Sequence, residues 1–122
     1  MLKNFNDKKK KKIISLVVIT KNEASCLAKC LQSTDFVSEI VVVDSGSTDD
    51  TVQIAERFGA KVFHQDWLGF GPQKQFAVNC AKYDWVLCLD ADEYLSPKLR
   101  ESLQKLFEKE PTAHAYRFPR CN

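Results

Sequence analysis

The sequence predicts an α/β domain with a mainly parallel sheet that helices cover on both faces. Two kinds of segment alternate along the chain: short apolar runs rich in β-branched residues, such as 39–44, and longer runs with apolar residues at helical spacing, such as 97–109. The apolar runs are continuous, which is typical of strands buried on both faces. Repeated strand–helix–strand units place such strands parallel to one another.

The predicted strands follow from their apolar, β-branched composition. Residues 13–20 and 39–44 are almost entirely of this kind, and residues 84–90 contain a further apolar run. Residues 60–64 are predicted as a short strand, and residues 113–118 as the beginning of a fifth.

The predicted helices follow from spacing and from end signals. Small or apolar residues recur at helical spacing in 23–31, and Asp49 and Asp50 lie where a helix over 51–58 favours negative charge. Gly59 ends that helix. A loop with two glycines, 67–72, precedes a helix over 73–81, and Pro97 is the first residue of a helix over 97–109.

Length and composition indicate one globular domain. Of the 122 residues, 44% are hydrophobic, so a core can form and intrinsic disorder is excluded for most of the chain. No apolar stretch approaches the roughly 20 residues of a membrane-spanning helix. The net charge of +2 comes from residues 1–12, which hold six lysines and one aspartate. The remainder has more acidic than basic residues, and no nucleic-acid partner is expected.

Residues 1–12 are predicted to be a basic, flexible tail. One interpretation is a solvated terminus, and the other is attraction to anionic lipid at a membrane surface. The tail lacks the apolar run and the small-residue cleavage site of a secretory signal. The cysteine count is odd and no zinc-ligand spacing occurs, which favours reduced thiols in a cytoplasmic protein; the residues are Cys26, Cys30, Cys80, Cys88 and Cys121.

Polar residues follow three of the predicted strands at their carboxyl ends. These segments are 20–23, 44–47 and 90–93. Ligands of open parallel sheets bind at this edge, so the three segments are expected to converge there.

The segment Asp90-Ala91-Asp92 places two carboxylates around one small residue. Such carboxylates can hold Mg²⁺ or Mn²⁺ together with phosphate oxygens and water. The alternative is a solvated turn, because so short a pattern recurs by chance. The buried strand before it favours the metal site, since that strand fixes where the carboxylates point.

Three other residues also have two interpretations each. Asp44 is either a turn former or an acceptor for a base or a ribose. Glu23 either meets a helix dipole or contacts the same nucleoside, beside Thr20. Lys74 faces either a phosphate or water. The glycines of 69–71 either allow a tight turn or let the backbone approach a ligand.

Several common sites are absent from the sequence. It contains neither the glycine pattern of dinucleotide-binding domains nor a phosphate-binding P-loop. No Ser-His-Asp or Cys-His arrangement can be argued from spacing, and His64 and His114 are expected to be structural or surface residues.

Segments 14–23, 41–49 and 84–93, taken in order, resemble family 2 glycosyltransferases with the GT-A fold. The middle segment 66–75 is similar, more narrowly, to bacterial transferases that extend the lipopolysaccharide core. This resemblance implies metal-assisted, inverting transfer of a sugar from a nucleoside diphosphate donor, with a UDP-sugar favoured, to a hydroxyl of a lipid-linked or glycan acceptor. The reduced cysteines predict a cytoplasmic location, at the inner face of the membrane if the tail binds lipid.

The resemblance also implies roles for individual residues. Asp92 would ligate the metal, Mg²⁺ or Mn²⁺. The nucleotide-sugar contacts would come from Thr20, Asn22, Glu23, Asp44, Lys74, Asp90 and Ala91.

Domains of this family are longer than this chain. Residues 13–122 are therefore expected to be the donor-binding part, with the catalytic base and the acceptor surface beyond Asn122. Glu93 adjoins the metal motif and is a poor substitute for the base.

Two other functions stay open. One is a fragment that binds a nucleotide sugar without transferring it. The other is an unrelated flavodoxin-like signalling or nucleotidyl-transfer domain that uses the acidic cluster for Mg²⁺, although no clear strand-end lysine supports a phosphoacceptor site.

Overall fold

The computed structural model describes residues 14–108 and 115–116. They form one five-stranded, all-parallel sheet in the order β3-β2-β1-β4-β5. The strands are β1 (Ile14–Thr20), β2 (Glu39–Asp44), β3 (Lys61–His64), β4 (Trp85–Asp90) and β5 (Ala115–Tyr116). The helices are α1 (Leu27–Gln32), α2 (Thr51–Arg57), α3 (Phe70–Cys80) and α4 (Pro97–Glu108).

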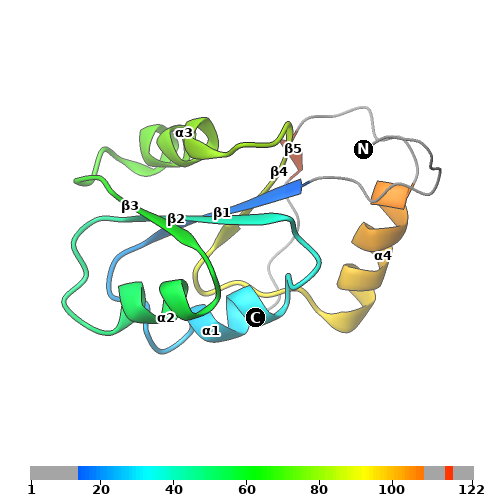
Figure 1. Cartoon of the computed structure of the whole chain (residues 1–122), viewed down its shortest axis with the longest axis horizontal. Coiled ribbons are helices and arrows are strands. Elements are labelled where there is room, and N and C mark those ends of the chain that lie inside the picture. Colours follow the sequence, from blue (N-terminus) through cyan, green and yellow to red (C-terminus); the bar gives the residue numbers. More distant parts are fainter. Residues whose placement is uncertain (1–13, 109–114, 117–122) are drawn as a thin grey trace.

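Helices lie on both faces of the sheet, with α1 and α2 on one side and α3 on the other (Figure 1). Successive residues of β1 point to opposite faces. Leu16 belongs to the core cluster that includes Leu27 of α1, whereas Val17 belongs to the cluster that includes Ala77 of α3. Both faces are therefore buried, which explains the continuous apolar runs and confirms the predicted α/β class with its parallel sheet.

Helix α1 begins later than predicted. The predicted helix over 23–31 is wrong at its start, because residues 24–26 form a turn and the helix begins at Leu27. The first N–H groups of a helix have no partner within it. Here, the N–H groups before α1 donate to side chains from the segment between β2 and α2 and from the first residue of α2. The N–H of Glu23 donates to Thr51 Oγ1 at 2.8 Å, and the N–H of Ala24 donates to Asp49 Oδ2 at 3.2 Å.

Helix α3 begins earlier than predicted. The predicted loop over 67–72 includes the first helical turn, which starts at Phe70. Pro72 fits in that turn because the first N–H groups of a helix need no partner within it. Gly69 precedes the helix with a φ of 104°, a conformation that favours glycine.

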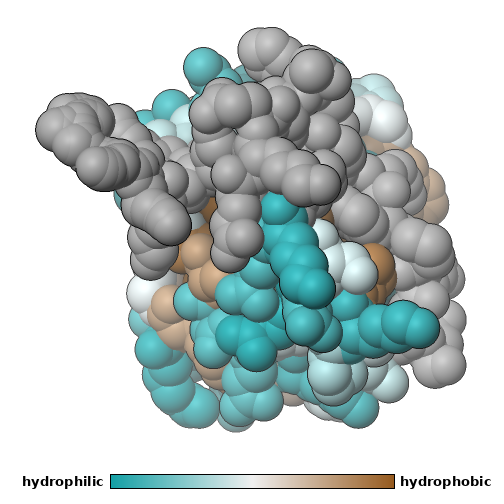
Figure 2. All heavy atoms as spheres, turned by 90° about the vertical axis from the view of Figure 1, so that its right-hand side faces the viewer, coloured by the Kyte–Doolittle hydropathy of each residue, from teal (hydrophilic) through white to brown (hydrophobic). Residues whose placement is uncertain are grey.

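Helix α4 lies beyond the amino-end side of the sheet and packs through its apolar residues (Figure 1). Leu103 is buried in the larger core cluster, and Leu99 packs against it. Figure 2 looks onto this end of the molecule, where the coloured residues are mainly hydrophilic. Among the described residues, no helix has both the length and the apolar character needed to cross a membrane.

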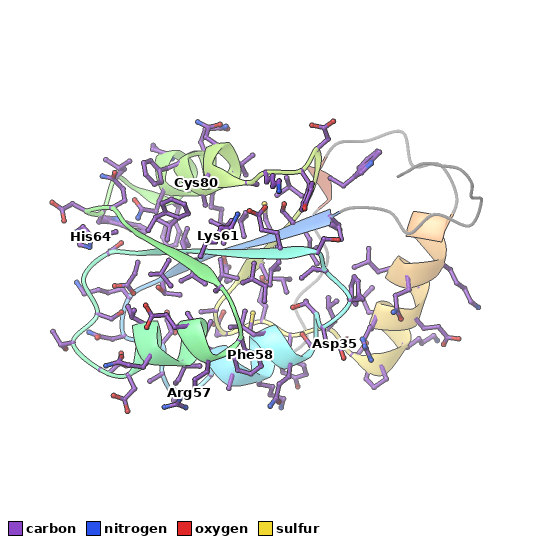
Figure 3. The ribbon with its side chains drawn as sticks, in the orientation of Figure 1. Asp35, Arg57, Phe58, Lys61, His64 and Cys80 are labelled. Carbon is purple, nitrogen blue, oxygen red and sulfur yellow. The ribbon has the colours of Figure 1, made fainter. Side chains whose placement is uncertain are left out.

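A buried carboxylate joins three strands and a loop at the amino-end edge of the sheet. Glu39 is 8% exposed; its Oε1 accepts from Ser15 Oγ at 2.6 Å and from the N–H of Lys82 at 2.8 Å. Its Oε2 pairs with Lys61 Nζ at 3.0 Å, and Lys61 is the first residue of β3 (Figure 3). Burial alone would raise the pKa of Glu39, but these hydrogen bonds and the lysine charge outweigh it and lower the pKa.

The described cysteines carry free thiols, as predicted; they are Cys26, Cys30, Cys80 and Cys88. Burial is the main cause that raises the pKa of Cys30 to about 12 and that of Cys26 to about 11, so both thiols are protonated at neutral pH. Cys121 and the predicted tail over 1–12 lie outside the described residues.

Candidate functional site

The carboxyl ends of the strands meet at one edge of the sheet. In the parallel registers, Thr20 lies opposite Asp44, Ile19 opposite Asp90, and Asp44 opposite His64. Segments 20–23, 44–47 and 90–93 therefore follow neighbouring strands and emerge on the same edge, as expected from the parallel topology.

The first two segments are cross-linked by hydrogen bonds. Thr20 Oγ1 donates to Asp44 Oδ1 at 2.7 Å. The N–H of Asn22 donates to Ser47 Oγ at 2.7 Å, and the N–H of Thr48 donates to Asn22 Oδ1 at 2.7 Å. Asn22 has a φ of 54°, a left-handed conformation that asparagine tolerates better than most residues. These contacts fix the segments after β1 and β2 relative to each other.

Asp44 is buried, and its carboxylate accepts four hydrogen bonds. Oδ2 accepts from the N–H groups of Gly46 at 2.9 Å and Ser47 at 2.7 Å. Oδ1 accepts from Thr20 Oγ1 and from Ser47 Oγ, the latter at 2.5 Å. Burial alone would raise the pKa of Asp44, but the hydrogen bonds from Ser47, Thr20 and Gly46 outweigh it and lower the pKa. The carboxylate is therefore ionised at neutral pH, and it accepts three hydrogen bonds from its own loop and one from Thr20 of β1.

Glu23 is partly buried, and its backbone and side chain have different partners. Its N–H is held by Thr51, as described above, and its Oε1 accepts from the thiol of Cys26 at 3.3 Å. Since α1 begins at Leu27, Glu23 lies before the helix and outside its first turn. The interpretation of Glu23 as a first-turn helix residue is therefore wrong, and its nucleoside contact stays a prediction.

Asp90 ends β4 and forms an ion pair with Lys74 of α3. Lys74 Nζ lies 3.1 Å from Asp90 Oδ1, and the two side chains are 21% and 20% exposed. The N–H of Asp90 donates to Oε1 of Glu93 at 2.7 Å, and Glu93 is itself buried. Helix α3 thus places a cation beside segment 90–93. Of the two interpretations of Lys74, contact with water alone does not describe its ammonium, which is paired with Asp90.

The two other residues of the acidic segment differ in exposure. Ala91 is 3% exposed and belongs to the core cluster, so it offers only backbone groups to a ligand. Asp92 is exposed. Within the described part of the chain, no three His, Cys, Asp or Glu side chains form a group that could hold a metal. Mg²⁺ is commonly held by one or two carboxylates with phosphate oxygens and water, and the residues present fit that mode.

Gln73 is a fully buried polar residue at this edge that was not predicted as a site residue from the sequence. Its Nε2 donates to Ser45 Oγ and to the carbonyl oxygen of Gln65, both at 3.1 Å, and its Oε1 accepts from the N–H of Leu68 at 3.0 Å. One signal was available: Gln73 is four residues before Ala77, so it shares the inward-facing side of α3.

Two exposed aromatic rings lie at the start of α3, one in the preceding loop and one on the first residue of the helix. Trp67 is 52% exposed and Phe70 is 71% exposed, with their ring centroids 5.0 Å apart and edge to face. His64 precedes this loop at the same edge (Figure 3) and pairs with Asp66 at 2.9 Å. The exposure of His64 agrees with its expected surface role, whereas His114 lies outside the described residues.

A doubly covered parallel sheet with acidic and amide groups at its carboxyl edge is typical of α/β domains that bind ligands there. Residues 15–121 match the family model for glycosyl transferase family 2, and the chain belongs to that family. The fold and the family agree with the resemblance argued from the sequence.

Curated relatives support the same family. An uncharacterized glycosyltransferase of Rickettsia felis is 50% identical over 95 residues, which cover 77% of this chain and 34% of that protein. The lipopolysaccharide core biosynthesis glycosyltransferase LpsC of Rhizobium meliloti is 38% identical over 98 residues, which cover 76% of this chain and 36% of that protein. The chain thus spans about a third of the length of these relatives.

Two solved structures share the fold. TarS residues 1–349 of S. aureus align with a TM-score of 0.65 and 28% identity, over 78% of this chain and 32% of that one. Glucosyl-3-phosphoglycerate synthase of Mycobacterium tuberculosis aligns with a TM-score of 0.58 and 26% identity, over 67% of this chain and 35% of that one. The latter structure is a complex with Mn²⁺, UDP and glucosyl-3-phosphoglycerate.

Proposed function

We propose that residues 13–122 bind the nucleoside diphosphate sugar of a family 2 glycosyltransferase at the carboxyl edge of the sheet, with residues 1–12 as a basic tail. The observation that carries this proposal is the meeting of three strand ends. The Asp44 loop is cross-linked to segment 20–23, and the Lys74–Asp90 ion pair lies at the end of the neighbouring strand. Hydroxyl, amide and charged groups are thus gathered along one edge, as a polar nucleotide requires.

The nucleoside is assigned to the side of the edge formed by Thr20, Asn22, Glu23 and Asp44. Because the Asp44 carboxylate accepts four hydrogen bonds from its own surroundings, a base or ribose donor binds it by replacing one of the hydroxyl donors. Thr20 and Ser47 supply those two hydroxyls.

The diphosphate is assigned to the side formed by Lys74, Asp90 and the backbone of Ala91. The Lys74 ammonium has three donors, so it can contact a phosphate oxygen while it stays beside Asp90. Asp92 is the residue proposed to hold Mg²⁺ or Mn²⁺ together with phosphate oxygens. A divalent ion bound there supplies positive charge that stabilises the departing nucleoside diphosphate.

The transfer reaction is proposed for the whole protein, because the chain spans about a third of the length of the relatives it matches. The name of the Rhizobium relative supports an acceptor in the lipopolysaccharide core, and the complex of the mycobacterial synthase supports UDP as the nucleotide. A cytoplasmic location, with the tail near anionic lipid, belongs to the same proposal.

The proposal is tested by titrating UDP into the chain by calorimetry, with MnCl₂ and with EDTA. Wild type binds UDP more tightly with Mn²⁺. Asp92→Ala lowers the affinity with Mn²⁺ by about tenfold or more, the effect of losing one contact to a charged group, and leaves the affinity in EDTA unchanged. The variant folds normally because Asp92 is exposed.

Asp84→Ala is the matched control for this experiment. Asp84 is also an exposed aspartate, but it precedes β4 at the opposite edge of the sheet. It keeps the wild-type response to Mn²⁺. Failure of wild type to bind UDP would contradict the proposed function, and equal responses of the two variants would contradict the role of Asp92.

A further inference from the structure

Gln73 is a completely buried polar residue near the proposed donor site. Its amide group uses both donors and its oxygen, through the three hydrogen bonds to Ser45, Gln65 and Leu68. We refer to the Gln73 side chain with these three partners as the amide clamp.

The amide clamp joins three separate parts of the carboxyl edge. Ser45 directly follows Asp44 at the end of β2, and Gln65 directly follows β3. The N–H of Gln65 also donates to the carbonyl of Asp44 at 2.9 Å, so the exit of β3 is already tied to β2. Through Leu68, the clamp attaches the loop that leads into α3 to the same place.

The first turn of α3 has no side-chain cap. Its N-cap residue, Gly69, provides no side-chain hydrogen bond, and the turn contains a second glycine at position 71. Glycines lower the intrinsic stability of a helical turn because they lose more backbone entropy than other residues. The clamp therefore supplies side-chain hydrogen bonds that attach this first turn to Ser45, Gln65 and Leu68.

Lys74 directly follows Gln73, at the start of the second turn of α3, and its ammonium lies 3.1 Å from Asp90. A lysine side chain is long and flexible, so its ammonium can occupy many positions. Holding the backbone in place limits the positions that the ammonium can reach. An apolar residue could fill the space that Gln73 occupies, but only an amide can hold a loop oxygen, a loop N–H and a hydroxyl at once.

We propose that Gln73 is a positioning residue for the diphosphate part of the donor: its amide clamp holds the first turn of α3 against the end of β2 and thereby keeps the Lys74 ammonium beside Asp90. This inference rests on the proposed function. It assigns Gln73 no contact with the ligand itself.

The test compares UDP with uridine, which lacks the phosphates, by calorimetry in MnCl₂. Gln73→Leu keeps the side-chain size but removes the clamp. We expect it to lower the affinity for UDP by about tenfold and to leave the affinity for uridine unchanged. A tenfold loss corresponds to the loss of one hydrogen bond between a lysine and a phosphate. Lys74→Ala has the same selective effect, and the double variant binds UDP no more weakly than Lys74→Ala alone.

The matched control is Gln75→Leu. Gln75 lies on the exposed side of the same helix and bonds only to Asn79 within the described side chains, at 3.0 Å, so its variant keeps the wild-type affinities. Circular dichroism establishes that each variant folds. If Gln73→Leu does not fold, Ser45→Ala removes one hydrogen bond of the clamp from the other side and is tested for the same selective loss.

Two results would overturn the inference while leaving the proposed function intact. One is an equal loss of UDP and uridine affinity in the clamp variant, and the other is an additive loss in the double variant, which would show that Gln73 acts independently of Lys74. Absence of UDP binding by wild type would instead overturn the proposed function, and the inference with it.

Discussion

At the scale of single residues, the carboxylates of this domain differ mainly in how many donors they already have. Asp44 accepts four hydrogen bonds and Glu39 accepts three, whereas Asp92 is exposed. From the sequence, Asp44 and Asp92 were predicted to lie at the carboxyl ends of strands, because each follows a recognisable apolar run. The four donors to Asp44 were not predicted, because Thr20 lies 24 residues away and the other three hydrogen bonds depend on how the loop after β2 folds.

Replacing Glu39 by glutamine tests the buried polar cluster at the amino-end edge. We expect Glu39→Gln to lower the free energy of unfolding at neutral pH by about 1–3 kcal/mol, because the lysine and hydroxyl donors lose their charged acceptor. Urea unfolding at pH 7 measures this loss, and Asp84→Ala, at an exposed position, serves as the control.

The same variant has a distinct pH dependence. The folded-state pKa of Glu39 lies below its ordinary value of 4.5, so its contribution is complete above that value and is lost as the pH falls through the lower, folded-state pKa. The stability difference between wild type and Glu39→Gln should therefore shrink on acidification below pH 4.5. A difference that stays constant, or grows, would contradict the assigned partners of Glu39.

At the scale of helices and strands, predictions from the sequence were correct where one local signal decided the structure. The runs that form β1 and β2 were predicted because β-branched residues fill them, and the end of α2 was predicted from Gly59. The starts of α1 and α3 were not, because hydrogen bonds from other segments decide them. Asp49 and Thr51 hold the turn before α1, and Gln73 holds the loop before α3.

Two glycines give alanine variants with opposite expected effects. Gly59 has a φ of 81° and open space around a Cβ, so Gly59→Ala destabilises by about 1 kcal/mol through backbone strain alone. Gly71 is helical and also has open space, so Gly71→Ala stabilises by about 0.5–1 kcal/mol through reduced unfolded-state entropy. Urea midpoints of the two variants measure both, and shifts of the same sign would contradict the assigned backbone conformations.

At the scale of the whole molecule, the alternation of strands and helices was enough to predict a parallel sheet with both faces covered. The alternation did not predict the strand order, because it does not indicate that β1 occupies the centre of the sheet, between β2 and β4. The meeting of segments 20–23, 44–47 and 90–93 follows from the parallel arrangement itself. The amide clamp does not, since it depends on how one loop folds back.

The position of each strand predicts its resistance to hydrogen exchange. β1 pairs with strands on both sides, whereas β3 ends the sheet within the described part of the chain and has exposed residues along it. Amides of β1 should exchange more slowly than those of β3 by more than about tenfold, since edge strands open locally at lower free energy. Exchange measured by NMR tests this, and equal protection would contradict the strand order.

The Ser15 hydroxyl has a consequence for the way this chain folds. It donates to Glu39, 24 residues away, and accepts from the N–H of Tyr83, 68 residues away. The chain segments that lead from β1 to β2 and from β1 to β4 are therefore both closed by hydrogen bonds to this one oxygen atom. Closing the longer loop costs about 1 kcal/mol more entropy than closing the shorter one. During synthesis on the ribosome, the pairing of β1 with β2 is therefore favoured first, and β4 joins a template that already exists.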